Sequence, residues 1–287
     1  SFQQALFADQ SYVLAPAMIS PTGVVKQEAK GWRLSGRWSW STGIMHADWV
    51  IPAAIMKVGD KRAPFFFAIP ADEVKVEDTW FVDGMQGTGS NDVLIEDVFV
   101  PEDRCVAYLD MVKGEGPGAE IHEGPLYRTP MLPILGLAAG LPALGQAKTC
   151  LRLYRERLEE IIESPSPTRQ AKASNFMRLA EADIQVQQAE LLLREMVDDV
   201  MVRRNNSTSE DRARWATQLA WAINEAKRAI ARISEVAGAS AHFQTHPMQR
   251  AVRDINTIAS HVIFDLDTRL EHRGRSMLGQ DVVGILV

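Results

Sequence analysis

The chain has 287 residues, of which 46% are hydrophobic and 24% are charged, with 19 glycines and 14 prolines. This composition is typical of a folded protein of two domains and excludes a disordered chain. The formal net charge is −6 and the basic residues are scattered, so the sequence predicts no binding to nucleic acid or to an anionic membrane.

Cys105 and Cys150 lie far apart, and neither belongs to a metal-binding motif. We therefore predict no disulfide framework and no metal site, and a reducing, cytoplasmic location fits best. The longest apolar run, residues 131–144, is broken by proline and glycine and is too short to cross a bilayer. The sequence opens at Ser1 without Met or a leader and at once enters an apolar stretch, so we expect that an N-terminal segment is missing.

Residues 1–110 are expected to form a β domain, because short β-rich runs alternate there with Gly, Pro and Asp. Trp32 and Leu34 alternate with polar neighbours, which is typical of a strand with one buried face. The predicted strands of this antiparallel sheet are residues 31–40, 49–58, 64–70, 74–81 and 93–101. Residues 111–133, rich in Gly and Pro, are expected to form a connector.

From residue 134 onward the hydrophobic period changes to that of helices, which predicts an antiparallel four-helix bundle over residues 134–287. The fold class is therefore α+β. The expected helices are residues 134–162, 170–203, 209–237 and 247–273. A capping box of Ser207 and Glu210 should start the third helix, and Pro247 suits the first turn of the fourth.

The stretch Gly36-Arg37-Trp38-Ser39-Trp40-Ser41-Thr42-Gly43 places a hydroxyl and the donors of a turn beside bulky aromatic side chains. Such a surface suits a flat cofactor with polar edges. The alternative is an ordinary strand end, where the tryptophans pack into a core and the hydroxyls satisfy turn backbone.

A second glycine-rich loop, residues 84–92, lies between two β runs. It lacks the Gly-Lys-Ser/Thr of a phosphate-binding loop, and no helix follows it, so a nucleotide-binding fingerprint is excluded. Its N–H and hydroxyl donors could bind an anion or the edge of a ring, and a plain β-turn remains the alternative.

The last predicted helix brings Asp254, Thr257, His261 and Asp265 onto one face. A carboxylate beside the imidazole would keep its pKa useful for proton transfer near neutrality, as a general base requires. A solvated polar stripe on an amphipathic helix is the alternative.

Several motifs, in this order, resemble the acyl-CoA dehydrogenase superfamily and most of all its flavin monooxygenase branch. The matching stretches are Gly31 to Gly36, Trp40 to Gly43 with His46 to Trp49, Gly87 to Asp92, Phe99 to Pro101, Gly238 to Ala241 and Pro247 to Asp254. The resemblance implies a β domain, a four-helix bundle with flavin between them, and the absence of the usual N-terminal helical domain. It also implies a homo-oligomer, a dimer or a tetramer.

By this resemblance Trp40, Thr42 and Gly43 contact the flavin, and Ser90 and Asn91 lie in the loop beside it. His261 resembles the histidine that the hydroxylases place over the ring as a base, and Thr42 would stabilise the reactive flavin adduct. From the residues themselves, we expect the substrate pocket to include His46, Tyr127 and Asp265, the last as a group that orients His261; a packing residue is the alternative for His46.

The implied enzyme is the oxygenase component of a two-component monooxygenase. It would take reduced FMN or FAD from a separate reductase, form a C4a-hydroperoxyflavin with O2, and hydroxylate a small aromatic or heteroatom substrate. An FAD-dependent acyl-CoA dehydrogenase or oxidase is one alternative, but the stretch Ser260 to Asp265 lacks its catalytic Glu. A flavin-free binding module that kept the fold is another.

Overall fold

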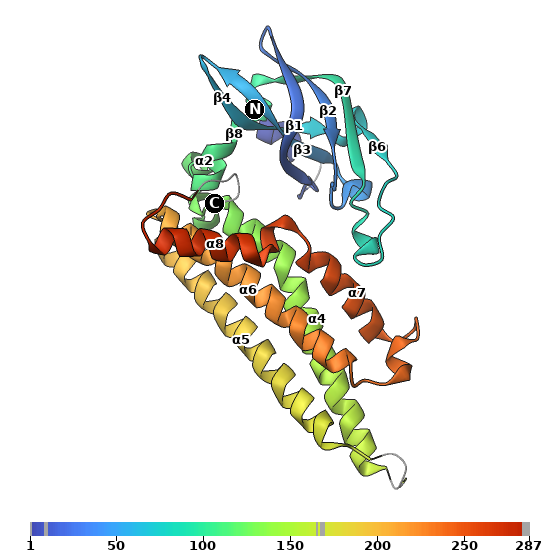
Figure 1. The fold of residues 1–287 in the computed structure, drawn as a ribbon. Coiled ribbons are helices and arrows are strands. Elements are labelled where there is room, and N and C mark those ends of the chain that lie inside the picture. The colour runs from blue at the N-terminus through green and yellow to red at the C-terminus, as the bar shows by residue number, and fades with distance from the viewer. Residues whose placement is uncertain (1, 9–10, 165, 167–169, 283–287) are drawn as a thin grey trace. The chain divides into compact units, whose positions relative to one another are not determined.

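The computed structural model describes residues 2–8, 11–164, 166 and 170–282 (Figure 1). The chain forms two compact units. The first comprises Ser1–Val82 and Gln86–Arg128 and contains the β-sheet. The second comprises Asp83–Met85 and Thr129–Val287 and contains the long helices. We call them the β unit and the helical unit.

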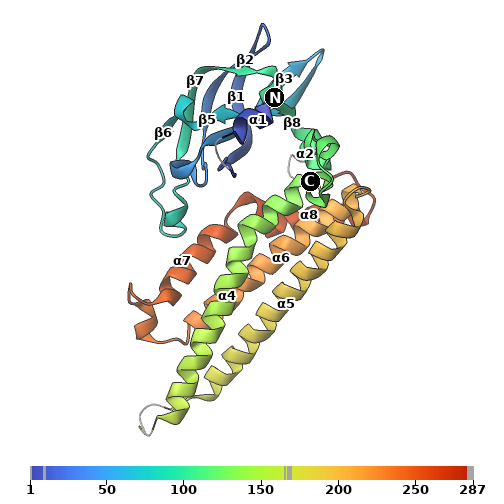
Figure 2. The same cartoon turned by 180° about the vertical axis from the view of Figure 1, so that it is seen from behind.

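The β unit is built on one sheet with the strand order β6-β7-β2-β1-β3-β4-β8, and β5 pairs with β3. The strands are β1 (Ala17–Glu28), β2 (Gly31–Trp38), β3 (Trp49–Val58), β4 (Lys61–Phe67), β5 (Ile69–Pro70), β6 (Lys75–Glu77), β7 (Asp92–Pro101) and β8 (Cys105–Ala107). Its described residues also form three short α-helices: α1 (Phe2–Leu6), α2 (Tyr108–Lys113) and α3 (Gly118–Ile121). Figure 2 shows the same strands from behind.

The prediction of a purely antiparallel sheet is wrong at one place, because β1 and β3 pair in parallel. β2 folds back on β1 as a hairpin, and the loop after Trp38 reverses the chain again, so β3 runs in the direction of β1. Strand β1 was not among the predicted strands. Pro21 and Gly23 are residue types common in turns, and here they lie where the register of the β1–β3 ladder shifts.

Trp38 forms the centre of the β unit's core, with 1% of its surface exposed. Its indole N–H donates to the carbonyl of Ala53 at 2.8 Å, so the buried polar atom is satisfied. A Cβ at Gly23 would lie 2.2 Å from the indole ring, which means that β1 can pass this close only with glycine at that position. The ring thereby fixes β1 against the end of β2, where the candidate site begins.

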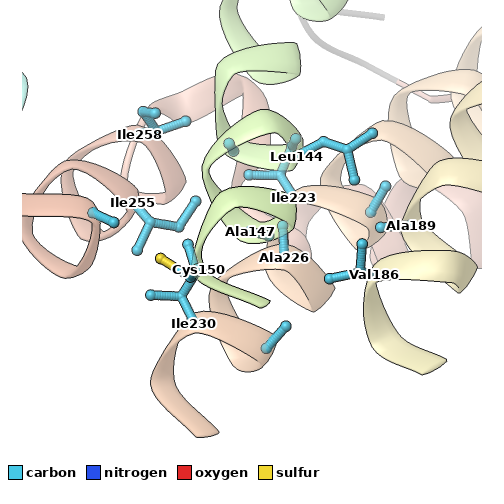
Figure 3. Close-up of a cluster of buried hydrophobic side chains, with 14 of the residues drawn as sticks. Leu144, Ala147, Cys150, Val186, Ala189, Ile223, Ala226, Ile230, Ile255 and Ile258 are labelled. Carbon is cyan, nitrogen blue, oxygen red and sulfur yellow. The ribbon is translucent and has the colours of Figure 1, made fainter. Parts of the chain in front are cut away.

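The helical unit contains α4 (Met131–Glu163), α5 (Ala173–Arg203), α6 (Ser209–Ser234), α7 (Pro247–Ala259) and α8 (Leu266–Met277). The three long helices, α4 to α6, run alternately in opposite directions, and α7 and α8 pack on α6 (Figures 1 and 2). Figure 3 shows small and branched side chains from α4, α5, α6 and α7 meeting in the core. Glycine allows close contact here, because a Cβ at Gly136 would lie 2.3 Å from Leu219.

The predicted connector, residues 111–133, contains α3 and the start of α4, and the helix prediction also fails at the fourth helix and at the cap of the third. The expected single helix over residues 247–273 is two helices, because α7 ends at Ala259 and a short 3-10 turn, Val262–Phe264, precedes α8. The capping box of α6 is formed by Thr208 and Asp211 rather than by Ser207 and Glu210. The hydroxyl of Thr208 accepts from the Asp211 N–H at 3.1 Å, and Asp211 accepts from the Thr208 N–H at 3.0 Å.

Helix α4 is long and apolar enough, by length and composition alone, to cross a membrane. A core helix passes the same test, and α4 packs against α5, α6 and α7 and contributes Leu137, Ala143 and Ala147 to the core. Its hydropathy is therefore weak support for a membrane span.

Candidate functional site: two joined loops of the β unit and a histidine turn of the helical unit

The two loops that the sequence singles out meet at one end of the sheet. The loop after β2 and the loop before β7 are adjacent, because Trp38 pairs with Val93 where these strands begin to separate. An ion pair braces this junction: the Arg37 guanidinium donates to the Asp92 carboxylate, with 2.9 Å between Nε and Oδ2. The Ser39 hydroxyl donates to the same oxygen at 3.2 Å. The loops therefore leave the sheet from a fixed base.

Backbone hydrogen bonds then tie the loops to each other along their length. The Ser41 N–H donates to the Asn91 carbonyl at 3.0 Å, and the Gly43 N–H donates to the Thr88 carbonyl at 2.9 Å. The amide oxygen of Asn91, which is 6% exposed, accepts from two successive N–H groups, those of residues 79 and 80, at 2.9 and 3.0 Å. Asn91 is thus a structural centre of the second loop, with its side-chain oxygen already occupied.

Three hydroxyl groups form a chain across the junction. The Thr42 and Ser90 hydroxyl oxygens are 3.0 Å apart, and the Ser90 and Thr88 oxygens are 2.8 Å apart. Ser90 is 3% exposed, whereas Thr42 lies at the surface. Each hydroxyl has one proton and can both donate and accept, so the chain can run in either direction. Thr42 can therefore present either a donor or an acceptor to a bound molecule.

Trp40 adopts an unusual backbone conformation next to this chain. Its φ is +66°, a left-handed value that a non-glycine residue rarely adopts, and its side chain is 72% exposed. The adjacent Ser41 is fully buried, and its hydroxyl has no hydrogen-bond partner among the described residues. Strained backbone and unsatisfied polar groups tend to gather at functional sites. The exposed indole and the surface hydroxyl of Thr42 form a surface onto which a flat ring could stack.

His46 and Tyr127 both belong to the β unit. His46 ends the 3-10 turn that follows Gly43, so it lies on the same loop as Thr42, and its side chain is exposed. Tyr127 stacks on the ring of His122, with 4.3 Å between centroids, and the segment around it packs against that pair. Hydrogen bonds thus join residues 41 and 43 to the second loop, whereas Tyr127 contacts His122 in its own segment.

His261 and Asp265 lie in the helical unit, but they do not share a helix face as predicted. The break after Ala259 places them on either side of the 3-10 turn, where each caps a helix. The His261 Nδ1 accepts from the Ile263 N–H at 3.2 Å, and the Asp265 Oδ1 accepts from the Thr268 N–H at 3.0 Å. The prediction that Asp265 orients His261 from the same face is therefore wrong, since its carboxylate is used as an N-cap.

The cap determines which nitrogen of His261 is protonated. Because Nδ1 accepts a hydrogen bond, the neutral ring must have its proton on Nε2. Desolvation by surrounding protein lowers the pKa of His261 from its ordinary 6.5, and the positive charge of Arg269 lowers it further. The lowered pKa keeps the ring neutral near pH 7, and the residue is exposed in the described chain.

Sequence patterns missed the residue that supports this turn. Arg269 is 2% exposed and donates to the carbonyls of Val262 and Ile263, at 3.3 and 3.2 Å. Arg269 is one of three arginines in α8, and nothing in the sequence marks it as the buried one. Only the break before α8 could have suggested that the freed carbonyls need a donor.

The family model described as "Acyl-CoA dehydrogenase, C-terminal domain" matches residues 137–266. A pigment production hydroxylase of Rhodococcus sp. is 32% identical over 283 residues, which cover 96% of this chain and 72% of that protein. The oxygenase component of an FADH2-dependent resorcinol hydroxylase from Rhizobium sp. is 28% identical over 281 residues, covering 92% of this chain and 68% of the relative.

A solved structure shows the same fold. The crystal structure of a 3-HSA hydroxylase from Rhodococcus sp. RHA1 matches with a TM-score of 0.93 and 26% identity, covering 99% of this chain and 75% of that one. These relatives are named as hydroxylases, which is the activity that the resemblance implied and not that of a dehydrogenase.

Proposed function

Because this chain belongs to the two-component flavin-dependent monooxygenases of the acyl-CoA dehydrogenase superfamily, we propose that it is an oxygenase component that hydroxylates a phenol. The reaction consumes FADH2, O2 and the phenol, and it yields FAD, water and a phenol with one more hydroxyl group. The observation that best supports this proposal is the joining of the Trp40–Thr42 loop to Ser90 in a single surface with an exposed indole and a hydroxyl chain.

The β unit offers groups that fit a flavin ring. When bound, the reduced flavin supplies the two electrons with which O2 is activated. Trp40 would cover part of the ring and exclude water from it, and the Thr42 hydroxyl would bond a heteroatom at the edge. Gly43 would give the ring access, because no described atom beyond Gly43 itself and its two chain neighbours lies within 4 Å of the Cβ position there. We assign Ser90 and Asn91, which are buried, to holding this surface in shape.

We assign the proton chemistry of the substrate to His261. The neutral ring has its proton on Nε2, so it can donate a hydrogen bond to a phenolate oxygen. To accept the phenol proton at Nε2, the ring must first move its own proton to Nδ1, which breaks the bond from the Ile263 N–H. Losing that hydrogen bond costs about 1 kcal/mol, which is a modest free-energy cost for a residue that acts as a base. His46, Tyr127 and Asp265 remain candidates for the substrate pocket.

The proposed partners follow from the family. A separate reductase would deliver the reduced flavin, since the resorcinol hydroxylase is named as FADH2-dependent and as an oxygenase component. FAD is favoured over FMN for the same reason. We also propose that the protein is cytoplasmic and forms a homo-oligomer, either a dimer or a tetramer, in which a neighbouring subunit helps to complete the site.

Anaerobic titration with FADH2, followed by mixing with aerated buffer and a panel of phenols, tests the proposal. We expect FADH2 to bind, and one phenol to gain a hydroxyl group with little release of hydrogen peroxide. Octanoyl-CoA should leave bound FAD oxidised. Reduction of FAD by the thioester would instead support the dehydrogenase alternative, and failure to bind either form of flavin would support the binding module.

A further inference from the structure

Three residues in the middle of the β-unit sequence, Asp83–Met85, pack within the helical unit. The Met85 N–H donates to Oδ1 of Asp254 at 2.6 Å, and the Arg253 guanidinium donates to the Asp83 carbonyl at 2.7 Å. The second carboxylate oxygen of Asp254 accepts from the Gln146 amide at 3.1 Å. We call Arg253, Asp254 and Gln146 the α7 clamp.

The segment Asp83–Met85 also packs closely against α7. A Cβ at Gly84 would lie 2.2 Å from the Arg253 carbonyl oxygen and 2.6 Å from the Thr257 hydroxyl, so only glycine allows the backbone to rest on α7 here. Met85 has a φ of +56°, and its side chain packs against the core of the helical unit. A strained backbone of this kind persists only where its surroundings hold it.

The clamp lies at the start of the loop that contains the hydroxyl chain. Residues 86–91 follow Met85 directly, and within them Thr88 and Ser90 join Thr42. Hydrogen bonds to an ionised carboxylate are about twice as strong as neutral ones. Asp254 receives two bonds, one of them from the backbone of the loop segment itself. The loop is therefore held at both ends, at Met85 by the clamp and at Asn91 by the bonds from residues 79 and 80.

We propose that Asp254 is a positioning residue for flavin binding, which keeps the start of this loop on α7 so that Ser90 holds Thr42 in place. This inference rests on the proposed function, because it assumes that the Thr42 surface receives the flavin. Asp254 itself touches neither flavin nor substrate in this role and acts through the loop.

The test compares four variants of the full chain by deuterium uptake of residues 80–91 and by anaerobic titration with FADH2. Asp254→Ala removes both bonds. Asp254→Asn keeps an oxygen for the Met85 N–H, and its amide can donate to the Gln146 oxygen, which has no partner in the described chain. Asn256→Ala is the matched control, an exposed position on α7 with no side-chain hydrogen bond among the described residues. Gly84→Ala pushes the loop off α7 without altering the helix.

In Asp254→Ala and Gly84→Ala, we expect uptake in the loop to rise about tenfold and FADH2 affinity to fall about tenfold, as for the loss of one charge-assisted bond. Asp254→Asn should recover most of both values, and Asn256→Ala should match the unaltered chain. The use of Gly84→Ala keeps the test decisive even if Asp254→Ala does not fold.

Unchanged uptake in both disrupting variants would overturn the inference, and so would faster uptake with unchanged FADH2 affinity. An Asp254→Asn variant as impaired as Asp254→Ala would also count against it. Failure of the unaltered chain to bind FADH2 would refute the proposed function instead, while the uptake values would still show whether the clamp holds the loop.

Discussion

The hydroxyl oxygens of Thr42 and Ser90 lie 3.0 Å apart, although the two residues are 48 positions apart in the chain. Ser90 is buried and also bonds to Thr88, so it serves as a fixed anchor for a residue at the surface. This contact gives the hydroxyl of a threonine on an exposed loop a defined position, which is what preorganised binding of a cofactor edge requires.

Replacing Thr42 by valine keeps the shape of the side chain and removes its hydroxyl. We expect the product formed per FADH2 consumed to fall about tenfold, the effect of losing one hydrogen bond of about 1.4 kcal/mol, with a matching rise in hydrogen peroxide. Thr42→Ser retains the hydroxyl and should stay close to the unaltered protein. Equal coupling in the valine and serine variants would show that the hydroxyl has no role.

Trp40→Gly separates the backbone role of this residue from its side-chain role. Glycine tolerates a φ of +66° without strain, but it also loses more entropy on folding, so the free energy of unfolding should change by less than about 1 kcal/mol. The affinity for FADH2 should nevertheless drop, because the indole is gone. Denaturant titration and anaerobic binding measure the two effects, and a variant with unaltered affinity would exclude Trp40 from the flavin site.

The lowered pKa of His261 predicts the pH dependence of the reaction. Because the folded pKa lies below the ordinary 6.5, a ring that must be neutral stays active as the pH falls past 6.5. The acid limb of the single-turnover rate should therefore appear below that value, and His261→Gln should abolish it. An acid limb centred above 6.5, or one that persists in the glutamine variant, would contradict this assignment.

The same shift has a consequence for stability. The folded state binds fewer protons at His261 than the unfolded state does, so the free energy of unfolding should fall as the pH drops from 6.5 through the folded pKa. His261→Gln should make this part of the pH profile shallower, as measured by denaturant titration at several pH values between about 5 and 7.

The capping box of α6 gives a test of the fold that does not involve flavin. Thr208→Ala should lower the free energy of unfolding by about 1 kcal/mol, because the Asp211 N–H loses its acceptor. Ser207→Ala, the position that the sequence motif favoured, should have a much smaller effect. Thermal melting of both variants decides the matter, and a larger loss at Ser207 would contradict the observed cap.

Sequence patterns predicted the helices and helix ends that are determined by neighbouring residues in the chain. Leu219, Ile223 and Ile230 recur at helical spacing and lie in the core of α6, and the start of α7 at Pro247 was recognised from the fixed φ of proline. Strand β1 was missed because Pro21 and Gly23 carry turn signals. Pairing makes that segment a strand: β1 forms a hairpin with β2, which follows it directly, and a parallel ladder with β3, which lies farther along the chain.

In the candidate site, too, some residues could be recognised from local sequence and others depended on contacts between distant segments. Composition alone drew attention to Thr42 and Ser90, since hydroxyl and glycine-rich loops are visible in a sequence. The proposed carboxylate partner of His261 was misplaced because helical periodicity was extended across the break after Ala259. The contact of Asp254 with Met85 joins residues 169 positions apart, and no local pattern could have indicated it.

The close approach of α4 and α6 links the identities of two residues. A methyl group at position 136 would collide with the Leu219 side chain, 2.3 Å away. The space between these helices is thus shared between the two positions, and a larger residue at one demands a smaller residue at the other. Natural relatives with alanine or serine in place of Gly136 should accordingly have a side chain shorter than leucine at the position of Leu219. An alignment of related protein sequences can test this covariation without purifying any protein.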